Sequence, residues 1–275
     1  MRVLLDRHHG VLHEALAILF EDRFGWETAV WIDGSYVTGP PMMDFPPRTS
    51  VTLSSEQVPD WQPDLVMATV GGTRNHLKSL AEEVGAVYVD HVGNAWDAPI
   101  SDHALRSVQG DYGLLYHPEF HRVPYAEPKG NRIGAFHGSL AVSPCRAHLD
   151  RAQREHPEWD FQLYGVAENP LYPWQVAQAM ADCFAIWHDK DADGYGFTVH
   201  EAFASGRPVI GHAGHYVGKL AEPLWQRGVT YLEPDDDLTK ADAAMGLRAF
   251  ARFEALVDFD AEADAIREYL EVLLR

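Results

Sequence analysis

Short apolar runs alternate with stretches of helical period along most of the chain. The run at 2–6 reads as a strand, and apolar residues three and four positions apart at 10–25 indicate a helix with one buried face. Gly25 is expected to end this helix, because glycine is favoured just beyond a helix C-terminus. Repetition of this strand and helix alternation predicts an α/β fold built on parallel sheets.

The expected elements form two series, one before residue 118 and one after residue 131. In the first series we expect strands at 2–6, 28–32, 64–70, 86–93 and 112–117 and helices at 10–25, 74–85 and 101–107. In the second we expect strands at 132–138, 160–165, 183–188 and 229–233 and helices at 145–157, 174–181, 238–257 and 261–274.

Two segments interrupt this alternation. Residues 33–63 are rich in turn formers and poor in periodicity, which is typical of a functional or disordered excursion. Residues 118–131 contain three prolines and no apolar period, as an interdomain linker does. We therefore expect an N-terminal domain over 1–125 and a C-terminal domain over 126–275. Each is expected to be a doubly wound α/β domain, and the two to face each other across a cleft with the chemistry at the carboxyl ends of the strands.

Composition narrows the class of partner. The chain of 275 residues carries a net charge of −19, which repels long nucleic acids and anionic membranes, and it shows no basic patch. No apolar run approaches the roughly 18 residues of a membrane helix, and the start resembles a strand rather than a signal peptide. Cys145 and Cys183 lie far apart and give neither a disulfide framework nor a thiolate metal site. We expect a cytoplasmic protein.

Residues 189–216 (DKDADGYGFTVHEAFASGRPVIGHAGHY) concentrate the candidate chemistry. Asp189, Asp191 and Asp193 match the first ligand positions of a calcium-binding EF-hand loop, but its last ligand position falls on His200, and Glu201 comes one residue too late. An Asp-x-Asp pair could instead hold a divalent metal on a diphosphate. The simplest interpretation is that at least two of these aspartates, Asp189 and Asp191 first, only solvate a loop.

The glycines in this stretch predict a different kind of site. Gly194 and Gly196 precede a short helix for which Thr198 is the expected N-cap, and Gly206 is expected to end it. A glycine turn before a helix N-terminus can bind an anion, because unpaired N–H groups and the helix dipole point the same way. Thr198-x-x-Glu201 also fits a capping box, in which Glu201 would only bond the Thr198 N–H.

These residues resemble a known signature. Asp193, seven residues and then Glu201, within GYGF and followed by AFASGRPVI, is similar to the donor site of retaining GT-B glycosyltransferases of the glycogen-synthase and sucrose-synthase type, the glycosyltransferases of group 1. The resemblance implies two Rossmann-like domains in the GT-B arrangement. It also implies transfer of a sugar from a UDP- or GDP-linked donor to an acceptor hydroxyl, with retention at the anomeric carbon.

The resemblance also assigns roles. Glu201 would bind the ribose hydroxyls of the donor, and Asp193, which stands where the family usually has Glu, would lie beside the donor sugar. The turn that approaches the sugar and diphosphate would comprise Gly194, Tyr195, Gly196, Phe197 and Thr198.

Further correspondences extend to the N-terminal domain. It would bind the acceptor, and the last helix, 261–274, would cross back to it. His91 resembles the histidine that family members hold near the donor sugar, and His8, His9 and Gly10 lie in the first strand-to-helix loop.

The chain departs from the family at the diphosphate. Family members present an Arg and a Lys early in the donor domain, whereas residues 134–152 contain no lysine. Arg146 is the expected substitute, together with N–H groups of the Gly138 turn, and Lys129 and Arg132 are the alternatives. Negative charge that develops on a leaving group needs such cations or dipoles.

No metal or cofactor is expected beyond the nucleotide sugar. His188, His212 and His215 lie near the same strand ends, but they lack the spacing of a zinc site. The acceptor is not identified by the sequence. A catalytically inactive nucleotide-sugar binding subunit and a GT-B-fold epimerase or sugar-nucleotide hydrolase remain the alternatives.

Overall fold

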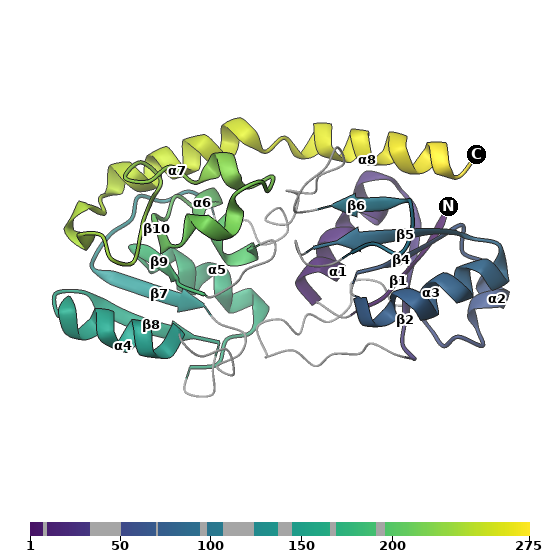
Figure 1. Ribbon diagram of the computed structural model, residues 1–275, viewed down its shortest axis with the longest axis horizontal. Helices are drawn as coiled ribbons and strands as arrows, with labels where there is room; N and C mark the ends of the chain where they lie inside the picture. The colour runs from purple at the N-terminus through teal and green to yellow at the C-terminus, as the bar shows by residue number, and fades with distance from the viewer. Residues whose placement is uncertain are drawn as a thin grey trace. The chain divides into compact units, whose positions relative to one another are not determined.

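A computed structural model of the protein describes residues 1–7, 10–33, 51–69, 71–93, 98–106, 124–136, 145–165, 169–190 and 196–275. The chain divides into two compact units (Figure 1). Of the described residues, those up to 106 and from 259 onward form the first unit, and those from 124 to 258 form the second.

The first unit is built on a six-stranded sheet in the order β3-β2-β1-β4-β5-β6, in which every strand pair is parallel. Its strands are β1 (Arg2–Leu5), β2 (Glu27–Trp31), β3 (Thr52–Leu53), β4 (Leu65–Ala68), β5 (Val87–Val92) and β6 (Ala104–Arg106). Its helices are α1 (Gly10–Ala17), which continues as a π-helix (Ile18–Arg23), α2 (Val58–Trp61), α3 (Gly71–Val84) and α8 (Phe259–Leu273).

Continuous apolar runs explain the strands of this sheet. Every residue of β4 is buried, as expected of a parallel strand that is covered by helices on both faces. Leu77, Leu80 and Ala81 of α3 pack against Leu4 and Val66 in the same core. The spacing of the α3 residues is the helical period that the sequence predicts.

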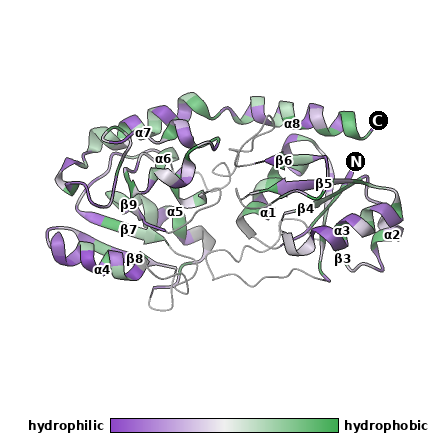
Figure 2. Cartoon of the chain, in the orientation of Figure 1, coloured by the Kyte–Doolittle hydropathy of each residue, from purple (hydrophilic) through white to green (hydrophobic). Residues whose placement is uncertain are grey.

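The last helix of the chain belongs to the first unit. Ala263, Ile266 and Leu270 of α8 are buried, and Figure 2 shows hydrophobic and hydrophilic residues alternating along it. The Tyr269 hydroxyl accepts a hydrogen bond from the Ala104 backbone N–H at 3.2 Å. The chain therefore ends on the unit in which it starts.

The second unit is built on a five-stranded sheet in the order β11-β10-β9-β7-β8, again with parallel pairs. Its strands are β7 (Arg132–Phe136), β8 (Asp160–Tyr164), β9 (Ala185–His188), β10 (Val209–Gly211) and β11 (Tyr231–Leu232). Its α-helices are α4 (Cys145–Glu155), α5 (Pro173–Ala181), α6 (Phe197–Ala204) and α7 (Ala243–Leu256), with short 3-10 helices at Ala213–Tyr216, Glu222–Leu224 and Leu238–Lys240.

The segment expected to be a linker is packed onto the second unit from residue 124 onward. The ring of Tyr125 lies 4.8 Å from that of Phe250 in α7. The buried guanidinium of Arg207 donates to the Ala126 carbonyl at 2.6 Å and to the Ala181 carbonyl at 2.8 Å. The carbonyl oxygens thus compensate the buried charge of Arg207. Arg207 in turn joins the segment that starts at residue 124 to the end of α5.

Three expectations in the first unit have different outcomes. The helix expected at 101–107 is wrong, because β6 pairs with β5 and the Asp90 carboxylate fixes the preceding turn through the Ile100 and Ser101 N–H groups. The excursion at 33–63 contains β3 and α2. The strand expected at 112–117 lies outside the described residues.

In the part of the chain that is described, no helix is both long and apolar enough to cross a bilayer.

Candidate functional site

The order of the strands marks one place in the second sheet for a ligand. The chain leaves β7 toward β8 on one side and later returns to place β9 on the other side. In doubly wound sheets, ligands bind at the carboxyl ends of the strands beside such a reversal. The residues that follow β7, β9 and β10 are therefore the candidate site.

The turn before α6 is set by Gly196. It is the N-cap residue, with φ 82°, so the prediction of Thr198 as N-cap is wrong. The Gly196 carbonyl accepts the His200 backbone N–H at 3.2 Å and the His200 Nδ1–H at 2.8 Å. A Cβ at Gly196 would lie 2.4 Å from the Tyr216 hydroxyl, so this turn requires glycine both for its φ and for its close packing.

Glu201 lies one turn inside α6 and is 7% exposed. A capping box pairs the N-cap residue with the third helical residue, which here is Val199. The explanation of Glu201 as a capping residue is therefore wrong. Phe197 and Thr198 form the first turn of the helix, where the helix dipole favours negative charge.

Imidazole and carboxylate side chains alternate across the carboxyl edge of the sheet. Asp189, which follows β9 and is 2% exposed, accepts His148 Nδ1–H at 2.5 Å, and its other carboxylate oxygen lies 2.9 Å from His212 Nε2. His212 Nδ1–H donates in turn to Glu233 at 2.9 Å, and the Tyr231 hydroxyl donates to Glu233 at 3.2 Å. Burial, and then the charge of Glu233, raises the pKa of Tyr231 to about 12, which keeps this donor protonated. We call these five residues the imidazole–carboxylate chain.

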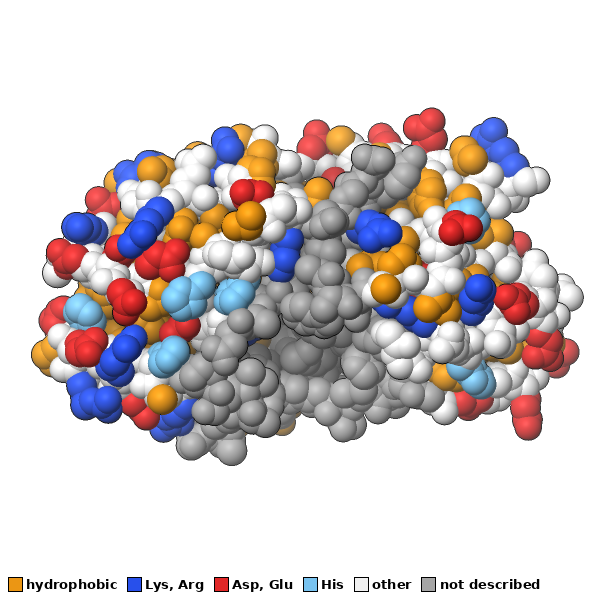
Figure 3. Space-filling model, viewed as in Figure 1, with side chains coloured by type: hydrophobic (Ala, Val, Ile, Leu, Met, Phe, Trp, Pro, Cys, Tyr) orange, Lys and Arg blue, Asp and Glu red, His pale blue; other side chains and the backbone are white. Residues whose placement is uncertain are grey.

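The imidazole–carboxylate chain links four neighbouring parts of the second unit. His148 comes from α4, which follows β7, and the other members come from the ends of β9, β10 and β11. Leu149, next to His148, packs into the core against the sheet and so fixes the helix that carries the imidazole. Figure 3 shows histidine and acidic side chains beside one another on the surface of this unit. The interpretation of Asp189 as a solvated loop residue is therefore wrong.

The cations expected at the diphosphate lie at different ends of the sheet. Arg146 is in the first turn of α4, at the carboxyl side of β7, and pairs with Asp150 at 3.3 Å. Arg132 begins β7 at its amino end and pairs with Asp160 at 2.9 Å, and Lys129 precedes it. Only Arg146 of these three is therefore carried on an element that starts at the ligand edge.

The structure describes only some of the other predicted site residues. Asp193, Gly194, Tyr195 and Gly138 lie outside the described residues. His188 is buried, with its Nε2 3.5 Å from the Tyr216 hydroxyl, and His215 Nε2–H donates to the Lys190 carbonyl at 2.6 Å. In the described ranges, no group of three or more His, Cys, Asp or Glu side chains is arranged to hold a metal.

Sequence reasoning missed His148 and Glu233. His148 lies within an expected helix and far along the chain from Asp189, and only the order of the strands brings them together. The position of His148 in its helix could have identified it as a candidate. It directly precedes the core residue Leu149, in the first half of a helix that starts at the carboxyl edge, where ligands bind.

The first sheet has its own reversal, between β1 and β4. Asp6, which follows β1 and is fully buried, accepts the Thr69 N–H at 3.0 Å and the Thr73 hydroxyl at 2.5 Å. Gly10 begins α1, while His8 and His9 lie outside the described residues. Burial, and then Arg7, lowers the pKa of His13 on α1 to about 4, so this imidazole is neutral in the folded protein.

His91 is 1% exposed and lies near the carboxyl end of β5. Its backbone carbonyl accepts a hydrogen bond from Arg74 at 3.0 Å, and Arg74 pairs with Asp90 at 3.2 Å. These contacts fix the end of the strand from which His91 projects. Its predicted proximity to a donor sugar stays a prediction.

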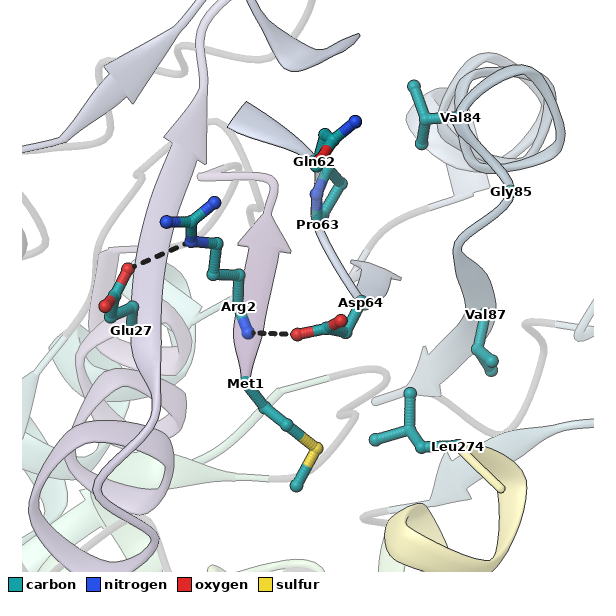
Figure 4. A pocket seen from close by; sticks show the side chains of 10 residues that line it. All are labelled: Met1, Arg2, Glu27, Gln62, Pro63, Asp64, Val84, Gly85, Val87 and Leu274. Atoms are coloured by element: carbon teal, nitrogen blue, oxygen red, sulfur yellow. Dashed lines mark hydrogen bonds and ion pairs between the residues drawn. The ribbon is translucent and has the colours of Figure 1, made fainter. Parts of the chain in front are cut away.

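A hollow in the first unit lies at the opposite edge of its sheet (Figure 4). Arg2 and Asp64, at the amino ends of strands, line it, and the Arg2 N–H donates to Asp64 at 2.8 Å while its guanidinium pairs with Glu27 at 3.2 Å. The charged groups of the hollow thus pair with one another, at the edge where doubly wound folds do not bind ligands.

Comparison with solved structures identifies the fold. HepE of Anabaena, solved with UDP and glucose, is 14% identical with a TM-score of 0.66 over 98% of this chain and 99% of that one. The sucrose-phosphate synthase of Thermosynechococcus elongatus is 13% identical with a TM-score of 0.57, over 99% of each chain. The glycosyltransferase VinC, solved with dTDP, is 15% identical with a TM-score of 0.56, also over 99% of each chain.

These similarities extend along the whole chain and show a GT-B fold with two Rossmann-like domains, which confirms the fold class expected from the sequence. No protein-family model matches the sequence, and no curated protein sequence matches it.

Proposed function

We propose that the protein is a retaining glycosyltransferase that moves a sugar from a nucleotide diphosphate sugar to an acceptor hydroxyl. The observation that carries the proposal is the position of Glu201, buried one turn inside α6 at the carboxyl edge of the second sheet and not used as a capping residue. Two of the solved structures with a similar fold hold UDP or dTDP, which supports a nucleotide ligand.

The chemistry of these residues suits a nucleotide sugar. An ionised carboxylate accepts hydrogen bonds from both hydroxyls of a ribose, which is the role proposed for Glu201. The N–H groups of Phe197 and Thr198, in the first turn of α6, suit the diphosphate, because the helix dipole there favours negative charge. Asp193 and Gly194 carry over from the sequence resemblance as groups beside the donor sugar.

In the proposed reaction the bond between the anomeric carbon and the diphosphate oxygen breaks, and the acceptor oxygen bonds to that carbon on the same face. The acceptor proton passes to an oxygen of the leaving diphosphate. Arg146 and the dipole of α6 would stabilise the negative charge that develops on this group. The first unit would bind the acceptor, with Gly10 as a proposed contributor, and His91 would act near the donor sugar.

Incubation with a panel of UDP-, GDP- and dTDP-sugars, with and without candidate acceptors, tests the proposal through the release of nucleotide. Release that depends on an acceptor supports transfer, and the anomeric configuration of the product, read by NMR, decides retention. Release without an acceptor would indicate a hydrolase or epimerase, and binding without release an inactive binding subunit.

A further inference from the structure

The imidazole–carboxylate chain holds its two imidazoles by three contacts between ring nitrogens and carboxylate oxygens. His148 Nδ1–H donates to Asp189 at 2.5 Å, and His212 Nδ1–H donates to Glu233 at 2.9 Å. The other ring nitrogen of His212, Nε2, lies 2.9 Å from the second carboxylate oxygen of Asp189. The Asp189 carboxylate therefore has one imidazole beside each of its oxygens.

His148 is held differently. Its Nδ1 donates to Asp189, so the opposite nitrogen, Nε2, points away from the carboxylate, and 36% of the side chain is exposed. Within the described residues, His148 Nε2 makes no hydrogen bond or ion pair. An imidazole with an N–H on each ring nitrogen has two donors, one for Asp189 and one for a ligand.

Charged groups lie on the elements next to His148. Arg146 and Arg151, also on α4, pair with Asp150 and, at 3.5 Å, with Asp235. Asp189 and Lys190 follow β9, and His212, Glu233 and Tyr231 continue across the edge. Most of these acids are paired with bases, which lowers the negative charge that an anionic ligand would meet beside His148.

The position of His148 suggests which ligand this is. α4 follows β7 and Asp189 follows β9, so the two residues flank the reversal in the second sheet at which a bound nucleotide is expected. Phosphate oxygens are the anionic part of such a ligand, and they bind strongly to charged N–H donors. Glu201, itself an acid, is suited to hydroxyls and not to phosphate.

We propose that His148, with an N–H on each ring nitrogen, binds a phosphate of the donor nucleotide through Nε2–H, and that Asp189, His212 and Glu233 hold it oriented. This inference rests on the proposed function, because it needs a nucleotide at this site. It gives the diphosphate an imidazole ligand that the nucleoside, which has no phosphate, does not contact. Loss of the His148 imidazole therefore weakens binding of a nucleoside diphosphate and leaves binding of the nucleoside unchanged.

The experiment is calorimetric titration with UDP, GDP and dTDP and with their nucleosides, using the diphosphate that binds the wild type. In His148→Asn the amide N–H can still donate to Asp189 in place of Nδ1–H, but nothing replaces Nε2. The matched control is His156→Asn. His156 also faces a carboxylate, Glu158 at 3.5 Å, but follows the opposite end of α4.

His148→Asn should weaken binding of the diphosphate about 10- to 100-fold, as expected for loss of one hydrogen bond to a charged phosphate. Nucleoside affinity should stay unchanged, and His156→Asn should match the wild type for both ligands. The decisive quantity is the ratio of wild-type to variant affinity for the diphosphate, compared with the same ratio for the nucleoside.

Several results would overturn the inference. Equal diphosphate affinity of wild type and His148→Asn would exclude His148 as a ligand while leaving the proposed function intact. A lowered melting temperature, with diphosphate and nucleoside weakened alike, would make the histidine a purely structural link between α4 and β9. If the wild type bound none of the nucleotides, the proposed function would fail and this inference with it.

Discussion

Glu201 is the residue on which the proposed donor site depends most. Its burial in a helix whose N-cap is Gly196 removes the structural explanation that the sequence offered. An ionised carboxylate has two oxygens that accept hydrogen bonds, and a ribose supplies two hydroxyl donors.

Replacing Glu201 with Gln should weaken nucleotide binding by about 1.5–3 kcal/mol, because a charged acceptor becomes a neutral amide of similar shape. Calorimetry with the same nucleoside diphosphate measures the change, and the matched control is Glu155→Gln, an exposed residue at the far end of α4. Unchanged affinity in Glu201→Gln would remove the residue from the donor site.

His13 predicts how the first unit responds to acid. Its pKa is lowered from 6.5 to about 4, first by burial and then by Arg7, so the folded protein resists protonation that the unfolded chain accepts. Above pH 6.5 the histidine is neutral in both states, so its lowered pKa does not change the free energy of unfolding there. As the pH falls from 6.5 toward 4, the unfolded state gains protons and the free energy of unfolding drops.

Between about pH 7 and about pH 5 this effect should lower the free energy of unfolding by about 2 kcal/mol. His13→Leu, which has no proton to take up, should lose that part of the pH dependence even if it is less stable at every pH. Urea unfolding at both pH values measures it. Parallel stability curves for the two proteins would show that His13 does not cause the acid sensitivity.

At the scale of elements, the start of α6 depends on the glycine turn. Gly196→Ala should destabilise the second unit by about 1–3 kcal/mol, because alanine is strained at the left-handed φ and its Cβ would contact the Tyr216 hydroxyl. Gly214→Ala is the control, since its Cβ would meet nothing within 4 Å. Thermal unfolding compares the two variants, and equal melting temperatures would contradict the strained turn.

The sequence predicted most of the elements and missed those set by tertiary contacts. Burial places apolar residues at regular positions in the sequence, and such a local pattern can be recognised. This is why the sequence predicted the strands β1, β4 and β5 and the helices α3, α4 and α8. By contrast, β6 is a strand because it pairs with β5, a contact that no local pattern encodes. The N-cap of α6 was misplaced by two residues because Gly196 uses a φ that side-chain capping rules do not consider.

The site was predicted in part for the same reason. Glu201 and the glycine turn lie close together in the sequence, so their spacing alone carries the resemblance to a donor site. The imidazole–carboxylate chain joins residues from 148 to 233, and it becomes visible only when the strand order is known.

For the whole molecule, the net charge has the same sign as the charge of the proposed donor. A chain of net charge −19 repels an anionic nucleotide sugar, so a donor site would need local positive potential. Arg146 and the N-terminus of α6, at the carboxyl edge of the second sheet, would supply it. The first unit, which carries no such group of cations around its described hollow, is not the expected place for the diphosphate.

Hydrogen–deuterium exchange of the full chain, with and without a saturating nucleoside diphosphate, tests the location of the donor site most directly. Exchange should slow at 185–190, 196–201 and 209–213, and it should stay unchanged at the amino edge of the first sheet around Arg2 and Asp64. Protection around Arg2 and Asp64, with none at 196–201, would contradict a donor site in the second unit.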